Sequence, residues 1–368
     1  MAQNMIARVE PRREKLRRLM RKTEVEALLV TNRSNVTYLT GFTGEDSYLL
    51  VTRDKELLIT DSRFATQLAE ECPGLDLEVR TQKLQMIDAL HRVIKGVKPK
   101  RLGVEAASMT VALKESLEKK LARVEFISTN GLVEQLREIK DRDEIAAIRR
   151  AVLHAERAFK VIRASLRLEQ TELQVATELE YQIRGFGGAG CGFPSIVAVG
   201  PRAALPHAPP GQQLIGDSNF VLIDWGARSP LYTSDLTRVL VTGKISPKLE
   251  RIYGVVLKAQ LAAIAAIRPG VRACDVDDAA RSVIDKAGYG RQFGHGTGHG
   301  IGLDIHETPR LSTLLERPLK AGMVITVEPG IYLPGWGGVR IEDDVLVTRD
   351  GHEVLSSLEK QLENCVVA

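Results

Sequence analysis

The chain has 368 residues, of which 44% are apolar and 27% are charged. This balance is that of a globular protein of about two domains, and it excludes a long disordered chain, which would combine low hydrophobicity with high net charge. The net charge of +4 and the aromatic content of 5% exclude nucleic-acid binding as the default function, because neither a basic surface nor base-stacking side chains are indicated.

Residues 1–134 alternate between helical and strand patterns, which predicts an α/β domain with a partly parallel sheet. Helices are predicted over 8–22, 64–71 and from about 86, and strands over 27–31, 47–52, 57–60, 77–80 and 101–104. The composition changes at the charged stretch 133–143, so we place a domain boundary there, between residues 134 and 135.

Residues 135–368 predict a second domain of mixed helices and strands, so the fold class is α/β in the broad sense that includes α+β. Helices are predicted over 145–166, 173–184, 248–267 and 273–287, and strands over 196–199, 220–224, 236–241, 324–327, 338–342 and 344–347. The glycine-rich segment 185–192 predicts a turn or a close approach of backbone.

The four cysteines lie far apart and form no CxxC pair, which is typical of reduced thiols in a cytoplasmic protein. The basic N-terminal segment lacks the apolar stretch and cleavage site of a secretory signal. The longest apolar run, around 261–267, is much shorter than the ~18 residues of a membrane span. We therefore expect a cytoplasmic protein with no membrane partner.

Three of the seven histidines, His295, His299 and His306, fall within twelve positions among five glycines. The glycines exclude a regular helix and favour a tight loop and strand whose backbone is accessible. Isolated histidines are usually structural, and we interpret His91, His154 and His352 in that way. Three in one glycine-rich segment indicate a functional site.

Four carboxylates fall at the ends of predicted apolar strands or inside them, namely Asp224, Asp235, Glu328 and Glu342. A hairpin would place Asp224 and Asp235 on one face. Each alone could be a helix cap or an ion-pair partner, but buried carboxylates are costly unless they are paired or bind a metal. Four gathered at one place would repel one another and raise each other's pKa.

Two divalent cations would balance four carboxylates, with one neutral imidazole as a further ligand. An oxygen-rich set with a single histidine suits Mn²⁺, Co²⁺, Fe²⁺ or Zn²⁺. Two such ions can share carboxylates, polarise a carbonyl and hold a hydroxide nucleophile. Other catalytic templates are absent from the sequence: it has no GxSxG elbow, no GxxxxGK[ST] loop, no HExxH helix and no GxGxxG after the first strand.

The segments ALPHAPP, LIDWGARSPLYTSDLTRVL, FGHGTGHGIGLDIHE, VEPGIY and GVRIEDD together resemble the signature set of the M24 metallopeptidases. The likeness is greatest to the Xaa-Pro aminopeptidase and Xaa-Pro dipeptidase (prolidase) branch. NVTYLTGFTG in the first domain resembles the creatinase/prolidase N-terminal domain. The resemblance implies a creatinase/prolidase-like domain over 1–134 followed by a pita-bread catalytic domain over 135–368.

The resemblance also implies roles for individual residues. It implies that two divalent ions, Mn²⁺ first with Co²⁺, Zn²⁺ or Fe²⁺ as alternatives, are held by Asp224, Asp235, His299, Glu328 and Glu342. It gives catalytic roles to Glu328, His207, His295, His306 and Arg340. A hydroxide bridging the metals would attack the carbonyl before proline, and Glu328 would shuttle its proton to the leaving nitrogen. His207 and His306 would hydrogen-bond the oxyanion or the substrate backbone, and Arg340 would hold Asp235 or a ligand carboxylate.

The leading hypothesis for function is an Xaa-Pro aminopeptidase acting on proline-containing peptides, and the alternative is a prolidase limited to dipeptides. Whether the C-terminal side of the cleft is blocked would separate the two. A small-metabolite hydrolase or a non-catalytic binding protein on the same fold are further alternatives, and the complete ligand set disfavours the second of these. The family resemblance also implies a homodimer.

Overall fold

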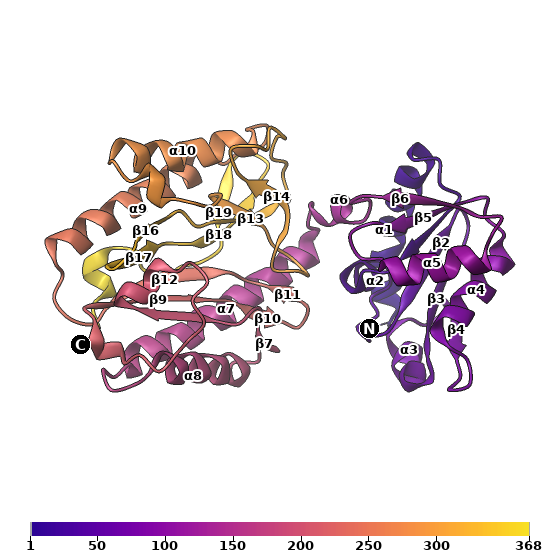
Figure 1. The fold of residues 1–368 in the computed structure, drawn as a ribbon, viewed down its shortest axis with the longest axis horizontal. Coiled ribbons are helices and arrows are strands. Elements are labelled where there is room, and N and C mark those ends of the chain that lie inside the picture. The colour runs from indigo at the N-terminus through magenta and orange to yellow at the C-terminus, as the bar shows by residue number, and fades with distance from the viewer. Residues whose placement is uncertain (1, 368) are drawn as a thin grey trace. The chain divides into compact units, whose positions relative to one another are not determined.

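The computed structural model describes residues 2–367, with side chains from residue 9 onward, and it divides into two compact units, residues 1–137 and 138–368 (Figure 1). The boundary that we predict after residue 134 lies within the short helix α6 (Glu134–Arg137). Within the described residues, no helix combines the length and the apolar character that crossing a membrane requires.

The first unit is built on a six-stranded sheet in the order β4-β3-β2-β1-β5-β6. The pairs β1–β5, β5–β6 and β3–β4 are parallel, and β1–β2 and β2–β3 are antiparallel, so the partly parallel sheet is confirmed. Its elements are α1 (Ala2–Lys22), β1 (Ala27–Val30), α2 (Arg33–Thr40), β2 (Tyr48–Thr52), β3 (Glu56–Asp61), α3 (Ala65–Glu71), β4 (Asp76–Arg80), α4 (Met86–Val97), β5 (Arg101–Glu105), α5 (Val111–Lys120) and β6 (Glu125–Thr129).

Besides the short helix α6, helices α2 and α5 and strand β6 lie outside our sequence-based prediction for this unit. Helix α2 is buried from Asn35 to Thr40, so it shows no polar face to produce a helical period. Helix α5 is dominated by charged residues and buries only Leu117 completely. Strand β6 lies at the edge of the sheet, and its two apolar residues, Phe126 and Ile127, are adjacent and half-buried, so the strand shows no alternation of apolar and polar residues.

The second unit places strands between two pairs of helices (Figure 1). Helices α7 (Arg142–Ser165) and α8 (Glu172–Gly185) form one pair, and α9 (Pro247–Ala266) and α10 (Ala273–Lys286) form the other. The strands are β7 (Gly190–Cys191), β8 (Ile196–Val199), β9 (Phe220–Trp225), β10 (Ala227–Ser229), β11 (Tyr232–Thr233), β12 (Leu236–Val241), β13 (Gly298–Gly300), β14 (Glu307–Leu311), β15 (Val324–Val327), β16 (Gly330–Leu333), β17 (Gly337–Arg340), β18 (Asp343–Val347) and β19 (His352–Val354).

The order of elements in this unit is a helix pair followed by strands, twice over. Helices α7 and α8 precede β7–β12, and α9 and α10 precede β13–β19. The strands form sheets in the orders β11-β10-β7, β12-β9-β8, β14-β13-β15-β18-β19 and β16-β17. Each helix pair packs against the strands through an apolar cluster of its own. The polar residues at the strand ends lie outside these two clusters, so they can face one another between the layers.

The helices of the second unit begin where the sequence supplies a cap. Asp141 and Glu144 form a capping box at the start of α7, and Thr171 and Gln174 form another at α8. Ser246 caps α9, with Pro247 in the first turn. The predicted starts at residues 145, 173 and 248 rest on apolar spacing alone, and they lie within three residues of these capped starts.

The strand positions of the four candidate carboxylates differ in detail from prediction. Asp224 lies in β9, and Asp235 directly precedes β12, whose Thr237 pairs with Asp224 in antiparallel register. The prediction that Glu328 lies inside a strand is wrong, because β15 ends at Val327 and the next residue after Glu328 is a proline. Glu342 follows β17 and bridges to Thr237.

Candidate active site

One cavity of about 770 Å³ is lined by every residue that the sequence analysis singled out for chemistry. The carboxylates come from β9, the residue before β12, the residue after β15 and the β17–β18 connection, and the imidazoles come from three separate segments. The residues brought together are Asp224, Asp235, His299, Glu328, Glu342, His207, His295, His306 and Arg340. The three histidines that we interpret as structural do not line this cavity.

His299 lies at the centre of the acidic group. One oxygen each of Asp235 and Glu342 and one ring nitrogen of His299 lie within 4.8 Å of one another. His299 Nε2 is 3.3 Å from Glu328 Oε1 and 3.6 Å from Asp235 Oδ2. His299 Nδ1 lies 3.0 Å from the carbonyl oxygen of Gly300, which can only accept, so Nδ1 carries the proton of the neutral ring. Nε2 therefore presents a lone pair to two carboxylates.

Burial sets the protonation of this group. It raises the pKa of Glu328 to about 8, and together with repulsion from neighbouring carboxylates it raises the pKa of Asp235 and Glu342 well above their ordinary values. Burial also raises the pKa of Asp224, although Arg340 opposes the increase. The same burial lowers the pKa of His299 to about 3, so its imidazole is neutral.

The chemistry of these donors fits divalent cations. Asp224 Oδ1 and Glu342 Oε1 are buried and accept no hydrogen bond from the described residues. Two orphaned carboxylate oxygens and an imidazole lone pair facing two acids would cost free energy without a cation, and a cation converts each of them into a ligand. An oxygen-rich set with a single imidazole suits hard or borderline divalent ions.

The hydroxyl of Thr326 and the carboxylate of Asp344 hold three of the candidate ligands in place. Thr326 Oγ1 accepts from the main-chain N–H of His299 at 3.0 Å and donates to Glu328 Oε1 at 3.3 Å. Asp344 Oδ2 accepts from the main-chain N–H of Asp235 at 3.0 Å. Neither Thr326 nor Asp344 was predicted from the sequence, where the only signal for them is that each lies two residues from a candidate ligand, Glu328 or Glu342.

Arg340 connects the acidic group to His295. Its Nη2 donates to Asp224 Oδ2 at 2.5 Å, so of the two partners expected for this arginine it contacts a candidate ligand carboxylate, Asp224, and not Asp235. Its Nη1 donates to the Tyr332 hydroxyl at 2.7 Å. His295 Nδ1 donates to the Gly296 carbonyl at 2.8 Å, so Tyr332 in turn donates to His295 Nε2 at 2.9 Å. Tyr332 belongs to the VEPGIY segment, but no role was predicted for it from the sequence.

His207 and His306 lie on the cavity wall with exposed side chains. The ring of His306 meets that of His299 edge-on, with 4.4 Å between the ring centres. Its ring is partly shielded from water by its neighbours, and this partial burial lowers the pKa of His306, which favours the neutral imidazole. Both imidazoles are therefore placed to contact a molecule in the cavity.

Arg310 also lines the cavity, and the sequence analysis missed it. It lies in β14, where residues 308 and 310 are exposed and residues 309 and 311 are buried. No hydrogen bond or ion pair engages its guanidinium among the side chains that the structure describes. The alternation of exposed and buried residues along β14 is a signal that could have predicted on which side of the strand Arg310 lies. Nothing in the sequence, however, places β14 beside the cavity.

Comparison with known families identifies both units. The sequence model of metallopeptidase family M24 matches residues 146–349, and that of the creatinase/prolidase N-terminal domain matches residues 12–139. The chain belongs to metallopeptidase family M24. This M24 peptidase is therefore a peptide hydrolase, and the expected order of a creatinase-type domain followed by a pita-bread domain is confirmed.

Relatives of this M24 peptidase are similar along nearly the whole chain. The Xaa-Pro dipeptidase of Pyrococcus horikoshii is 35% identical, covering 95% of this chain and 97% of the relative. The structure of an Xaa-Pro dipeptidase from Bacillus anthracis has a TM-score of 0.92 at 38% identity, covering 96% of this chain and 99% of that one. That of an X-Pro aminopeptidase from Thermotoga maritima has a TM-score of 0.84 at 35% identity, covering 92% and 97%.

The raised carboxyl pKa values predict how the stability of the metal-free M24 peptidase depends on pH. A carboxyl whose pKa is higher in the folded state stabilises the fold below the unfolded value of about 4, and this stability is lost as pH rises toward the folded value, about 8 for Glu328. Each such group changes the free energy of unfolding by up to ~1.4 kcal/mol per pH unit. We therefore expect Tm of the metal-free protein to fall between about pH 5 and about pH 8.

Thermal unfolding of chelator-treated and Mn²⁺-loaded protein at both pH values tests this expectation. The loaded protein is the control, because bound cations offset the repulsion and should reduce the fall in Tm. A metal-free protein whose Tm stays level or rises over this range would contradict the raised pKa values.

Proposed function

We propose that this M24 peptidase is an Xaa-Pro dipeptidase that works with two divalent cations. The observation that carries the proposal is the convergence of four carboxylates on one neutral imidazole whose free lone pair faces two of them. In this proposal the metal ligands are Asp224, Asp235, His299, Glu328 and Glu342. Manganese is the ion we expect first, with Co²⁺, Zn²⁺ or Fe²⁺ as alternatives.

The bound cations would polarise the carbonyl before proline and lower the pKa of a water molecule. Glu328 is the proposed proton carrier, because its carboxylate faces the cavity where the scissile bond would lie. The leaving proline nitrogen must receive a proton, and a carboxyl group beside the reacting atoms can deliver it. His207 and His306 would donate hydrogen bonds to the carbonyl oxygen as negative charge develops on it.

Arg340 and Tyr332 would keep this site ordered. Arg340 fixes Asp224 with a buried charge-assisted hydrogen bond, and Tyr332 links Arg340 to His295. Both ring nitrogens of His295 are engaged within the protein, so we assign His295 to holding Tyr332 in place.

The preference for dipeptides over longer peptides rests on Arg310 and on the named relatives. An Xaa-Pro dipeptide ends in a carboxylate next to the scissile bond, and an unengaged guanidinium on the cavity wall is a suitable partner for it. Xaa-Pro dipeptidases are among the most similar relatives, which reverses the order of our two sequence-based hypotheses. The X-Pro aminopeptidase of Thermotoga maritima keeps the aminopeptidase as the second candidate. The homodimer and the cytoplasmic location stay predictions.

Metal removal and resupply test the activity. Chelator-treated protein should cleave neither Ala-Pro nor Ala-Pro-Ala, and added Mn²⁺ should restore cleavage of Ala-Pro. Released amino acids, measured by chromatography, provide the readout. Cleavage of Ala-Pro-Ala would favour the aminopeptidase, and failure to cleave either peptide with metal demonstrably bound would overturn the proposal.

Glu328→Gln should abolish most of kcat while the fold persists, because glutamine can neither carry a proton nor contribute a charged ligand. We expect a loss of at least ~100-fold, within the range typical of general acid–base catalysis. Circular dichroism controls for folding, and exposed Glu359→Gln controls for removal of a carboxylate elsewhere in the same unit. Turnover close to that of the wild type would contradict the role of Glu328.

Arg310→Met should raise KM for Ala-Pro by about tenfold, the order expected for one lost charge-assisted hydrogen bond. Ala-Pro amide, which lacks the carboxylate, should be cleaved equally by the wild type and the variant. Arg228→Met is the matched control, because Arg228 is exposed on β10 and does not line the cavity. An equal loss of activity on Ala-Pro and on Ala-Pro amide would show that Arg310 does not bind the substrate carboxylate.

A further inference from the structure

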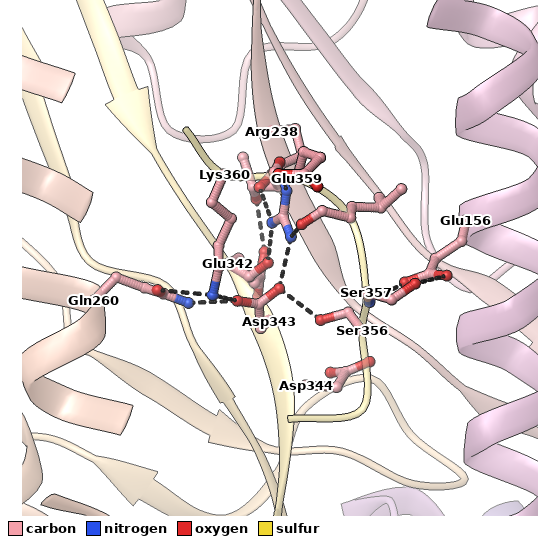
Figure 2. A network of polar contacts seen from close by, with 12 residues as sticks. Glu156, Arg238, Gln260, Glu342, Asp343, Asp344, Ser356, Ser357, Glu359 and Lys360 are labelled. Atoms are coloured by element: carbon pink, nitrogen blue, oxygen red, sulfur yellow. Dashed lines mark hydrogen bonds and ion pairs between the residues drawn. The ribbon is translucent and has the colours of Figure 1, made fainter. Parts of the chain in front are cut away.

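Glu342 begins a run of three acidic residues, Glu342-Asp343-Asp344, and each of the three is at most 1% exposed. Successive side chains in extended backbone point to opposite sides. Glu342 lines the cavity, whereas Asp343 points away from it into a separate polar network (Figure 2). A charged residue that is buried directly behind a candidate metal ligand requires a physical explanation.

Asp343 is the centre of that network (Figure 2). Arg238 of β12 donates to it at 2.7 Å and Lys360 at 2.6 Å, so its charge is balanced by two cations. Gln260 of α9 donates at 2.7 Å and Ser356 at 2.5 Å. Four partners from three parts of the second unit therefore converge on one carboxylate.

Arg238 carries this anchoring to Glu342. The guanidinium is completely buried, and its Nη1 donates to the carbonyl oxygen of Glu342 at 2.6 Å while Nη2 donates to Asp343. Its remaining donors reach the carbonyl oxygens of Thr237, Leu358 and Glu359. The planar fork of arginine can hold several acceptors at once in a fixed geometry, which a lysine cannot do.

Strand β12 holds Glu342 at three of its four polar groups. The main-chain N–H of Glu342 donates to the Thr237 carbonyl at 3.2 Å, and its carbonyl accepts from Arg238. Its Oε2 accepts from the Thr237 hydroxyl at 2.6 Å. Glu342 Oε1 is the group left without a partner among the described residues. The residue is thus fixed so that one oxygen is directed into the cavity.

We propose that Asp343 and Arg238 are positioning residues that set the place of the Glu342 carboxylate in the metal site. This inference rests on the proposed function, in which Glu342 is a metal ligand. Asp343 holds the guanidinium of Arg238, and Arg238 holds the main chain of Glu342. Partners that orient metal ligands from behind typically change metal affinity about 10- to 100-fold when they are altered.

Asp343→Asn is the main test, because it keeps the size of the side chain and removes the charge that balances Arg238 and Lys360. Isothermal titration of Mn²⁺ into metal-free protein should show about 10- to 100-fold weaker binding of at least one ion. The kcat on Ala-Pro should be reduced at low Mn²⁺ and should recover at high Mn²⁺, because positioning affects occupancy of the site. Circular dichroism of the metal-free variant controls for folding, because bound metal would also stabilise a marginal fold.

Glu156→Gln is the matched control. Glu156 of α7 is a buried carboxylate that accepts from the main chain and hydroxyl of Ser357, so it anchors the same C-terminal segment but does not contact Arg238, Asp343 or Glu342 (Figure 2). Its variant should bind Mn²⁺ like the wild type. Equal weakening in the Glu156 and Asp343 variants would overturn the proposal, as would an unchanged affinity in the Asp343 variant.

Two further variants distinguish a failure of the positioning role from a failure of the proposed function. Ser356→Ala removes one hydrogen bond to Asp343 and should weaken Mn²⁺ binding less than Asp343→Asn, which provides a test if the latter variant does not fold. Glu342→Gln should lose binding of at least one ion. Wild-type affinity in the Glu342 variant would contradict the proposed function itself, whereas a loss there with none in the Asp343 and Ser356 variants would refute only the positioning role.

Discussion

The burial of several carboxylates beside one another is the constraint on which the second unit depends. Asp235, Glu342 and Glu328 each have a raised pKa, with burial as the largest cause, and repulsion from neighbouring acids raises it further in all three. A cluster of buried, ionised carboxylates costs free energy unless a cation among them balances the charge. The family membership in M24 and the free lone pair of His299 give the same explanation, namely a site built around cations.

The surrounding structure holds these acids in place by contacts that differ for each one. Arg340 pairs with Asp224, Thr326 contacts Glu328, and Asp344 holds the main chain of Asp235. Glu342 is held by β12, whose Arg238 is balanced by Asp343 on the far side of the strand. Each contact fixes an acid while leaving an oxygen or a lone pair directed inward, which is the property that a preorganised metal site needs.

Local signals predicted most of the helices and strands, because caps and apolar periods act over a few residues. The apolar periods of α7 and α8 and the apolar run of β9 are examples. The prediction was incomplete where tertiary burial removes the period, as in α2, or where an edge strand is only partly buried, as in β6, and short strands such as β10, β11 and β19 were not predicted. It was wrong for Glu328, because Pro329 ends the strand before it.

The sequence by itself determined the kinds of groups at the site, since acids on apolar strands and histidines among glycines are costly without a function. It also indicated the family, because the motifs are specific as an ordered set, and the family models that match the chain confirm it. The tertiary structure decided which groups meet: it brought Arg310 from β14 to the cavity wall, joined Arg340 to Asp224, and placed Arg238 against Glu342 and Asp343. The last two contacts join residues more than a hundred positions apart, and no local pattern records them because they follow from how the strands pack.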